Sequence, residues 1–310
     1  MQQTTDTILM IRPVNFRMNE ETAVNNYFQE DLDLKNAEIN KKAQEEFDAF
    51  VYKLRAVGIN IVVENDDELM DTPDSIFPNN WVSFHSNGDV ALYPMFAENR
   101  RKERRDEVFI RLEQEGFKIE NIVDYTSAEN EGIFLEGTGS LLLDRVNSKA
   151  YCALSPRADE DLFIEFCEDF EYTPVVFTAN QTVEGKRLPI YHTNVMMCLA
   201  ETFAVICLDT IDDKKERKNV VKHLKQDGKE IISITEAQMH QFAGNMLQLR
   251  GENKQRYLVM SEAAHKSLTA QQIKAIEKHC PILSSSLETI ETCGGGSARC
   301  MMAEVFLPKT

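Results

Sequence analysis

The stretch HTNVMMCLAETFAVICLDTIDDKKERKNVVKHLKQDGKEIISI, residues 192–234, contains one complete structural unit. Its apolar segments His192–Leu199 and Phe203–Leu208 are separated by a short polar turn and predict the two strands of a hairpin. A charged helical stretch follows over Asp212–Gln226 and ends at a glycine. The segment Glu230–Ile234 then predicts a third strand. The order of elements is therefore hairpin, helix, strand.

The same order recurs along the chain. Three further segments each predict a hairpin, followed by a helical stretch and a strand. Equivalent positions in the first strand of successive units are 59, 55, 51 and 55 residues apart. A period of about 50 residues is typical of repeat architectures such as propellers. These equivalent positions are Asn80, Gly139, Asn194, Asn245 and Cys300.

The fifth unit is divided between the two ends of the chain. Thr7–Arg12 predicts a strand without a hairpin partner, and Ala298–Leu307 supplies that partner; the helix Ile39–Val57 and the strand Ile59–Glu64 complete the unit. We therefore expect an α/β fold, a five-fold pseudosymmetric α/β propeller of hairpin–helix–strand repeats closed by pairing of the terminal strands. It would form one catalytic domain over residues 1–310. Accidental alternation in an ordinary α/β domain is the alternative.

The composition limits the classes of partner. The chain has 34 Lys and Arg against 51 Asp and Glu, a net charge of −17, whereas binding to nucleic acid or an anionic membrane surface requires clustered cations. No apolar run approaches the roughly 20 residues of a membrane span, and Ile8–Ile11 is too short for a signal peptide. Seven cysteines in no regular pattern favour reduced thiols. We expect a cytoplasmic protein with a small-molecule substrate, no nucleic-acid partner and no membrane partner; a homodimer is left open.

Rotation-related units would bring residues that are far apart in sequence to one axial pocket. Cys300, His192 and Glu136 would meet there, and a thiol, an imidazole and a carboxylate together form a nucleophilic site. Each alone has a structural explanation, as a buried thiol, a hydrogen-bonded histidine or a strand-end carboxylate. The three residues occupy similar places in their repeats, which favours a catalytic role over three separate structural ones. The positive charge of Arg299 would favour the thiolate form of the adjacent Cys300. The other five histidines show no paired ligand spacing, so no metal site is predicted.

Four short segments carry a resemblance to a known family: PDSIFPNNW at residues 73–81, EGTGS at 136–140, YHTN at 191–194 and GGGSARCM at 294–301. They resemble the guanidine- and ureido-modifying hydrolases and amidinotransferases of the pentein fold. The resemblance spans the whole chain. Within the family the resemblance is strongest to the citrulline-utilisation hydrolase group, which is related to arginine deiminases and dimethylarginine dimethylaminohydrolases. The residues that carry this finer resemblance are Arg12-Pro13, Phe16, Asn19, Thr22, Asn26 and Gln29.

The resemblance implies a role for particular residues. Cys300 would be the nucleophile, His192 the general acid/base, and Glu136 a carboxylate that holds the substrate nitrogens. No metal or organic cofactor is implied. A further set is implied to bind the substrate: Asp74, Asn80, Asn194, Arg157 and Arg100.

The arginines are expected to hold a carboxylate. Arg157 ends the segment ALSPR, which resembles the segment whose arginine binds the substrate α-carboxylate in arginine deiminases. Arg100 or Arg101, after the segment YPM, resembles a second carboxylate ligand, with solvated charge at a helix end as the alternative. The polar segment Val14–Leu34 is either a lid over the pocket or an ordinary surface connection.

The sequence departs from the arginine deiminases at two positions. They place Asp where this chain has Asn80, and His-x-Asp where it has His192-Thr193-Asn194. A guanidinium ion has only donors and needs carboxylates, whereas a neutral ureido group also offers an acceptor. The two amides therefore favour a ureido substrate. Arginine dihydrolases of the same fold also carry an asparagine at the position of Asn80, so arginine is not excluded.

We therefore expect a cysteine-dependent hydrolase of a carbon–nitrogen bond in an arginine-like amino acid, converting citrulline to ornithine, ammonia and carbon dioxide. Alternatives that use the same three catalytic residues are an arginine deiminase or dihydrolase, a dimethylarginine hydrolase, and an amidinotransferase, which needs an acceptor amine. A remote alternative is a non-catalytic pentein of the ribosome-binding type. Such a protein would not need a glutamate, a histidine and a cysteine at equivalent positions of its repeats.

Overall fold

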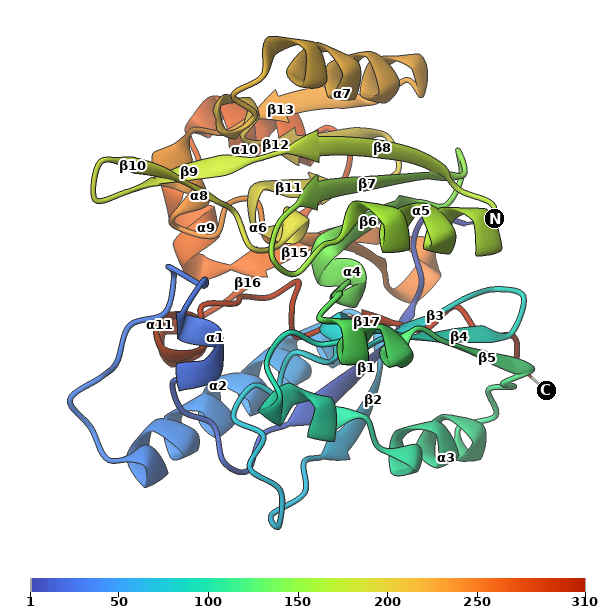
Figure 1. Cartoon of the computed structure of the whole chain (residues 1–310), viewed down its shortest axis with the longest axis vertical. Helices are drawn as coiled ribbons and strands as arrows, with labels where there is room; N and C mark the ends of the chain where they lie inside the picture. Colours follow the sequence, from blue (N-terminus) through green and yellow to red (C-terminus); the bar gives the residue numbers. More distant parts are fainter. Residues whose placement is uncertain (1, 310) are drawn as a thin grey trace.

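The computed structural model describes residues 2–309, whose strands form five three-stranded sheets and one separate hairpin (Figure 1). In every three-stranded sheet the first strand pairs antiparallel with the second, and the second pairs parallel with the third. The predicted hairpin–helix–strand order is therefore confirmed in each unit. The sheets are β17 (Ala303–Glu304), β1 (Thr7–Arg12), β2 (Asn60–Asn65); β3 (Val82–Phe84), β4 (Asp89–Leu92), β5 (Asn121–Asp124); β6 (Leu141–Asp144), β7 (Lys149–Leu154), β8 (Thr173–Thr178); β11 (Met197–Leu199), β12 (Phe203–Ile206), β13 (Glu230–Ser233); β14 (Leu247–Arg250), β15 (Arg256–Ser261), β16 (Ile282–Ser285); and the hairpin β9 (Asn180–Val183), β10 (Lys186–Pro189).

A helical connection joins the second strand to the third in each unit, because parallel neighbours cannot be joined by a tight turn. In one of these helices the Asp159 side chain accepts from the backbone N–H of Leu162 at 3.1 Å and caps the first turn. No helix in the described part of the chain combines enough length and apolarity to cross a bilayer. The connecting helices are α2 (Asn36–Ala56), α3 (Asp106–Gln114), α5 (Glu160–Asp169), α7 (Lys214–Gln226), and α9 (Glu262–Ser267) with α10 (Ala270–Glu277); shorter helices are α1 (Glu20–Ala23), α4 (Gly137–Ser140), α6 (Thr193–Met196), α8 (Glu236–Met239) and α11 (Glu288–Gly294).

The two ends of the chain pair as the sequence predicts. β1 runs antiparallel to β17, with Ile8 opposite Glu304 and Leu9 opposite Ala303, and the two strands lie together in Figure 1. Helix α2 packs against β2 of the same sheet, and its Phe50 belongs to the same buried apolar cluster as Ile8. The split fifth unit is therefore confirmed.

The five sheets remain separate as hydrogen-bonded units within residues 2–309. Contacts between first strands link several neighbours: β6 contacts β11, β11 contacts β14, and β17 contacts β3. The structure thus has a mixed α/β fold of five equivalent sheets. None of the sheets closes, so the closed five-fold propeller stays a prediction.

The first strands begin later than the sequence predicts. The residues at the equivalent repeat positions lie in turns immediately before these strands, and not in the strands themselves. Apolar segments of this kind suit a strand and a buried turn equally, so periodicity alone does not separate the two. The turns are η1 (Pro78–Asn80), α4, α6, the loop at Asn245 before β14, and the turn at Cys300 before β17.

Close contact between these turns explains why they are not extended. A Cβ on Gly139 would lie 2.8 Å from Nδ1 of His192 and closer still to Nδ2 of Asn80. Gly137, at φ +41°, has a backbone conformation that L side chains rarely adopt. Glycine at these two positions lets α4 lie directly against η1 and α6. The equivalent turns therefore meet, as the repeat predicts.

Candidate active site

Cys300 is buried among amide donors. Nδ2 of Asn245 lies 3.2 Å from Sγ, and Nδ2 of Asn194 lies 3.4 Å from it. The adjacent Arg299 turns away and donates from Nη2 to the Glu304 carboxylate at 2.9 Å. The expectation that Arg299 favours a thiolate stays a prediction, and the pairing of its charge with Glu304 does not favour it. The groups that contact the sulfur are neutral amides.

His192 and Glu136 form a buried pair, with Nε2 and Oε2 2.7 Å apart. Burial alone raises the pKa of Glu136, but the Arg157 guanidinium and His192 together lower it to about 2. Burial lowers the pKa of His192 to about 4, because it outweighs the opposing effect of Glu136. At neutral pH the carboxylate is therefore charged and the imidazole neutral.

These charge states decide which nitrogen of His192 carries the proton. An ionised carboxylate only accepts hydrogen bonds, so Nε2 must be the protonated nitrogen that faces Glu136. Nδ1 then carries the lone pair, and it has no hydrogen-bond partner among the described residues. His192 therefore presents an unoccupied base inside the protein.

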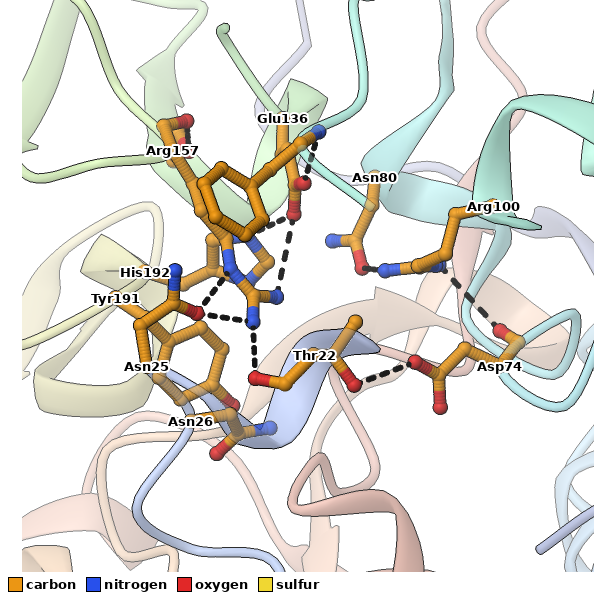
Figure 2. Close-up of polar contacts among 12 residues, drawn as sticks. Thr22, Asn25, Asn26, Asp74, Asn80, Arg100, Glu136, Arg157, Tyr191 and His192 are labelled. Carbon is orange, nitrogen blue, oxygen red and sulfur yellow. Dashed lines mark hydrogen bonds and ion pairs between the residues drawn. The ribbon is translucent and has the colours of Figure 1, made fainter. Parts of the chain in front are cut away.

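The Arg157 guanidinium lies between Glu136 and the segment that carries Thr22 and Asn25 (Figure 2). Nη1 is 3.5 Å from Oε2 of Glu136, and the guanidinium carbon is 4.9 Å from the centre of the Tyr191 ring. Nε donates to Oδ1 of Asn25 and Nη2 donates to the backbone carbonyl of Thr22, both at 2.8 Å. The last two partners are neutral, so a carboxylate would be a stronger partner than either.

Arg100 is buried and engaged on all sides by protein groups. Nε and Nη2 form a salt bridge with Glu103 at 2.9 and 3.0 Å. Nη1 donates to Oδ1 of Asn80 at 2.8 Å, and Nη2 also donates to the backbone carbonyl of Phe77 at 3.1 Å. The oxygen of Asn80 is therefore occupied, and its NH₂ group points the other way, towards His192 (Figure 2).

Asp74 is a buried carboxylate beside Arg100. Oδ2 accepts from Nδ2 of Asn19 at 2.8 Å and from Oγ1 of Thr22 at 3.0 Å. Oδ1 has no hydrogen-bond partner within residues 2–309. Burial raises the pKa of Asp74, although the nearby Arg100 opposes this effect. One oxygen of this carboxylate is thus available to a ligand.

The segment at residues 14–34, which contains α1, covers the site. Its side chains bind Asp74 and Arg157, and Nδ2 of Asn26 donates to the backbone carbonyl of Gly294 at 3.3 Å. The side chains behind it are sealed: Cys300 is 2% exposed. The sulfur is therefore not accessible to a substrate in this conformation.

The structure brings the predicted site residues into one region. His192 is the N-cap residue of α6, and Asn194 is the second residue of that helix. The same turn therefore contacts Glu136 through His192 and Cys300 through Asn194. Arg101, the alternative to Arg100, donates instead to the backbone carbonyl of Met95. No group of three or more His, Cys, Asp or Glu side chains in the described part of the chain could hold a metal ion.

Sequence reasoning missed three residues of this region. Glu103 neutralises Arg100, and the spacing of three residues between them was a usable signal of an ion pair. Tyr191 stacks under Arg157, and Asn25 binds it. No periodic pattern marks either residue, because their contacts are made across the fold.

Solved structures with the same fold include several hydrolases. The cyanobacterial arginine dihydrolase ArgZ matches with a TM-score of 0.74 at 15% identity, over 98% of this chain but 41% of that chain. The N-terminal domain of ArgZ bound to substrate gives 0.70 at 15% identity, over 97% of this chain and 99% of that one. A dimethylarginine dimethylaminohydrolase adduct with S-methyl-L-thiocitrulline gives 0.62 at 15% identity, with coverage of 97% and 99%. The chain thus spans less than half the length of full ArgZ, and the likeness supports the pentein fold.

Sequence comparison identifies the family. No curated protein matches the chain. The family profile described as N,N dimethylarginine dimethylhydrolase, eukaryotic, matches residues 12–307, which is nearly the entire chain. The chain therefore belongs to the family described as N,N dimethylarginine dimethylhydrolase, eukaryotic.

Proposed function

We propose that the chain is a cysteine hydrolase of a ureido carbon–nitrogen bond, acting as a single catalytic domain, and that citrulline is its substrate. The observation that carries the proposal is the orientation of Asn80. Its Oδ1 is held by Arg100 at 2.8 Å and its Nδ2 donates one hydrogen to Oδ1 of Asn79 at 3.1 Å, so one N–H of Asn80 is left for the region of His192. Asn194 likewise directs its NH₂ to the sulfur of Cys300.

Donors at these positions suit a ureido group better than a guanidinium ion. A guanidinium has no acceptor, so the N–H groups of Asn80 offer it nothing. The carbonyl oxygen of a ureido group accepts hydrogen bonds, and it gains negative charge when the carbon is attacked. Glu136 remains as an ionised acceptor for the ureido N–H groups.

The reaction begins with attack on the ureido carbon. The Nδ1 lone pair of His192 takes the thiol proton of Cys300, and the sulfur bonds to the carbon. His192 then returns that proton to the departing terminal nitrogen, which leaves as ammonia. Water attacks the thioester-like intermediate with His192 as base, which releases the thiol and a carbamate of ornithine. Decomposition of the carbamate gives ornithine and carbon dioxide, so one water is consumed in all.

The charged ends of the substrate have candidate partners. We assign the α-carboxylate to Arg157, whose neutral partners Asn25 and Thr22 it would replace. We assign the α-ammonium group to Asp74, which has one unpartnered oxygen. Arg100 acts by positioning Asn80, and its contacts with Glu103 do not favour the expected role of carboxylate ligand.

A guanidino substrate, arginine or dimethylarginine, is the second candidate. The family match favours it, and so does the ionised Glu136, which can bind a cation. An amidinotransferase would use the same residues but would turn over only with an acceptor amine.

Product analysis separates these reactions. Purified protein is given citrulline, arginine or dimethylarginine separately, and ornithine, citrulline, ammonia and dimethylamine are measured, with Cys300→Ala as control. The proposal expects ornithine and one ammonia from citrulline, and none from the Cys300→Ala variant. Ornithine or citrulline from arginine, or dimethylamine from dimethylarginine, with no turnover of citrulline, would overturn it in favour of the guanidino substrate.

A further inference from the structure

Asn245 has every polar atom of its side chain engaged, although the proposed mechanism does not use it. Oδ1 accepts from the backbone N–H of Arg299 at 3.0 Å. Nδ2 donates to the backbone carbonyl of Asn194 at 3.1 Å and to Sγ of Cys300 at 3.2 Å. Because a backbone N–H can only donate, Oδ1 must face Arg299 and the NH₂ group must face the sulfur. The amide orientation is therefore fixed by the fold.

Asn194 completes the environment of the sulfur. Its Nδ2 is 3.4 Å from Sγ, and its Oδ1, 3.8 Å away, can accept from the thiol when the sulfur is protonated. Both asparagines are fully buried. A buried sulfur anion is strongly disfavoured unless donors replace the lost water, and two amide N–H groups provide such donors.

We propose that Asn245 is a further catalytic residue, which together with Asn194 stabilises the sulfur anion that forms when Cys300 loses its proton. This inference rests on the proposed role of Cys300 as the nucleophile. Asn245 occupies the same position in its repeat as Asn194 and Cys300 occupy in theirs, so the pseudosymmetry of the fold delivers both donors to the sulfur.

A second amide–sulfur contact in the same repeat provides a matched control. Nε2 of Gln248 lies 3.4 Å from Sγ of the buried Cys280. Burial nevertheless raises the pKa of the Cys280 thiol. Burial also raises the pKa of five other thiols, so alkylation at neutral pH has a low background: Cys152, Cys167, Cys198, Cys207 and Cys293.

The test is the pH profile of Cys300 alkylation by iodoacetamide, followed by mass spectrometry of the Cys300 peptide. Asn245→Asp keeps an oxygen for the Arg299 N–H but replaces the donor to the sulfur with an acceptor. Asn245→Ala removes the donor without adding a charge. Loss of one hydrogen bond to an ion predicts alkylation about 10- to 100-fold slower at neutral pH in both variants. The difference should shrink as rising pH ionises the thiol unaided.

A merely structural role for Asn245 would change the rate by a factor that does not depend on pH. A pH profile of either folded variant equal to that of the unaltered protein, or shifted by the same factor at every pH, overturns the inference. Gln248→Leu should leave the Cys300 profile unchanged. If both Asn245 variants fail to fold, the pH titration of the ultraviolet thiolate absorbance of the unaltered protein minus that of Cys300→Ala decides: a Cys300 sulfur that ionises at no lower pH than an ordinary thiol overturns the inference.

The two proposals fail in different ways. Turnover by Cys300→Ala would refute the nucleophile itself, and with it the basis of the inference. Loss of turnover in Cys300→Ala, together with an unchanged alkylation profile in Asn245→Asp, would refute the inference alone.

Discussion

Replacement of Arg100 by methionine tests whether the orientation of one amide selects the substrate. The change removes the cation from Glu103, and both side chains are no more than 2% exposed. It also removes the donor from Oδ1 of Asn80. Breaking a buried ion pair costs about 3–5 kcal/mol, a large part of a typical free energy of unfolding of about 5–15 kcal/mol. For a chain of this length the melting temperature should fall by roughly 5–8 °C.

The same change should shift the substrate preference. Without Arg100, only the hydrogen bond from Nδ2 to Oδ1 of Asn79 opposes rotation of the Asn80 amide, and rotation would present its oxygen to a guanidinium ion. A gained or lost hydrogen bond in a buried site changes the free energy by about 1–3 kcal/mol, which is roughly 5- to 150-fold. The ratio of kcat/KM for citrulline to that for arginine should therefore fall by a factor in this range.

The double variant Arg100→Met/Glu103→Leu separates stability from selectivity. Replacement of both charges by apolar groups of similar size is often close to neutral for stability, so urea unfolding should return towards that of the unaltered protein. The altered ratio for citrulline and arginine should persist, because no cation holds the oxygen of Asn80 in the double variant either. A stable double variant with an unchanged ratio would refute the reasoning about Asn80.

Three further outcomes are expected. The pKa of His192 falls from its usual 6.5 to about 4 on folding, so the folded protein binds fewer protons between these values. The contribution of His192 to the free energy of unfolding is fully present above pH 6.5, and about 3 kcal/mol of it is lost as the pH falls towards 4. Urea unfolding measured across this pH range should show the loss in the unaltered protein and not in His192→Asn. Gly139→Ala places a Cβ against the His192 ring, and kcat/KM should fall by about 100-fold. Asn25→Ala removes an acceptor of Arg157, and alkylation of Cys300 should be about tenfold faster as the cover opens more readily.

The repeat was predictable because its signals are local. Alternating apolar residues, turn residues and glycine stops mark each hairpin, helix and strand, and the spacing of equivalent residues follows. The same spacing predicted that residues as distant as Asn194 and Cys300 would meet, which their contact confirms. The predicted starts of the first strands were wrong, because close packing between glycine-containing turns keeps the residues before each strand from being extended. The ion-pair partner of Arg299 was not predicted, since Glu304 belongs to the following strand.

The sequence by itself determined which chemical groups the proposed reaction would use: a thiol, an imidazole, a carboxylate, and amides at two positions where arginine deiminases carry carboxylates. Only the tertiary structure decided what the amides offer. The two ends of an amide have nearly the same shape but opposite hydrogen-bonding roles. Which end faces the site depends on groups brought from elsewhere in the chain: Arg100 holds the oxygen of Asn80, and the backbone N–H of Arg299 holds the oxygen of a third amide, Asn245.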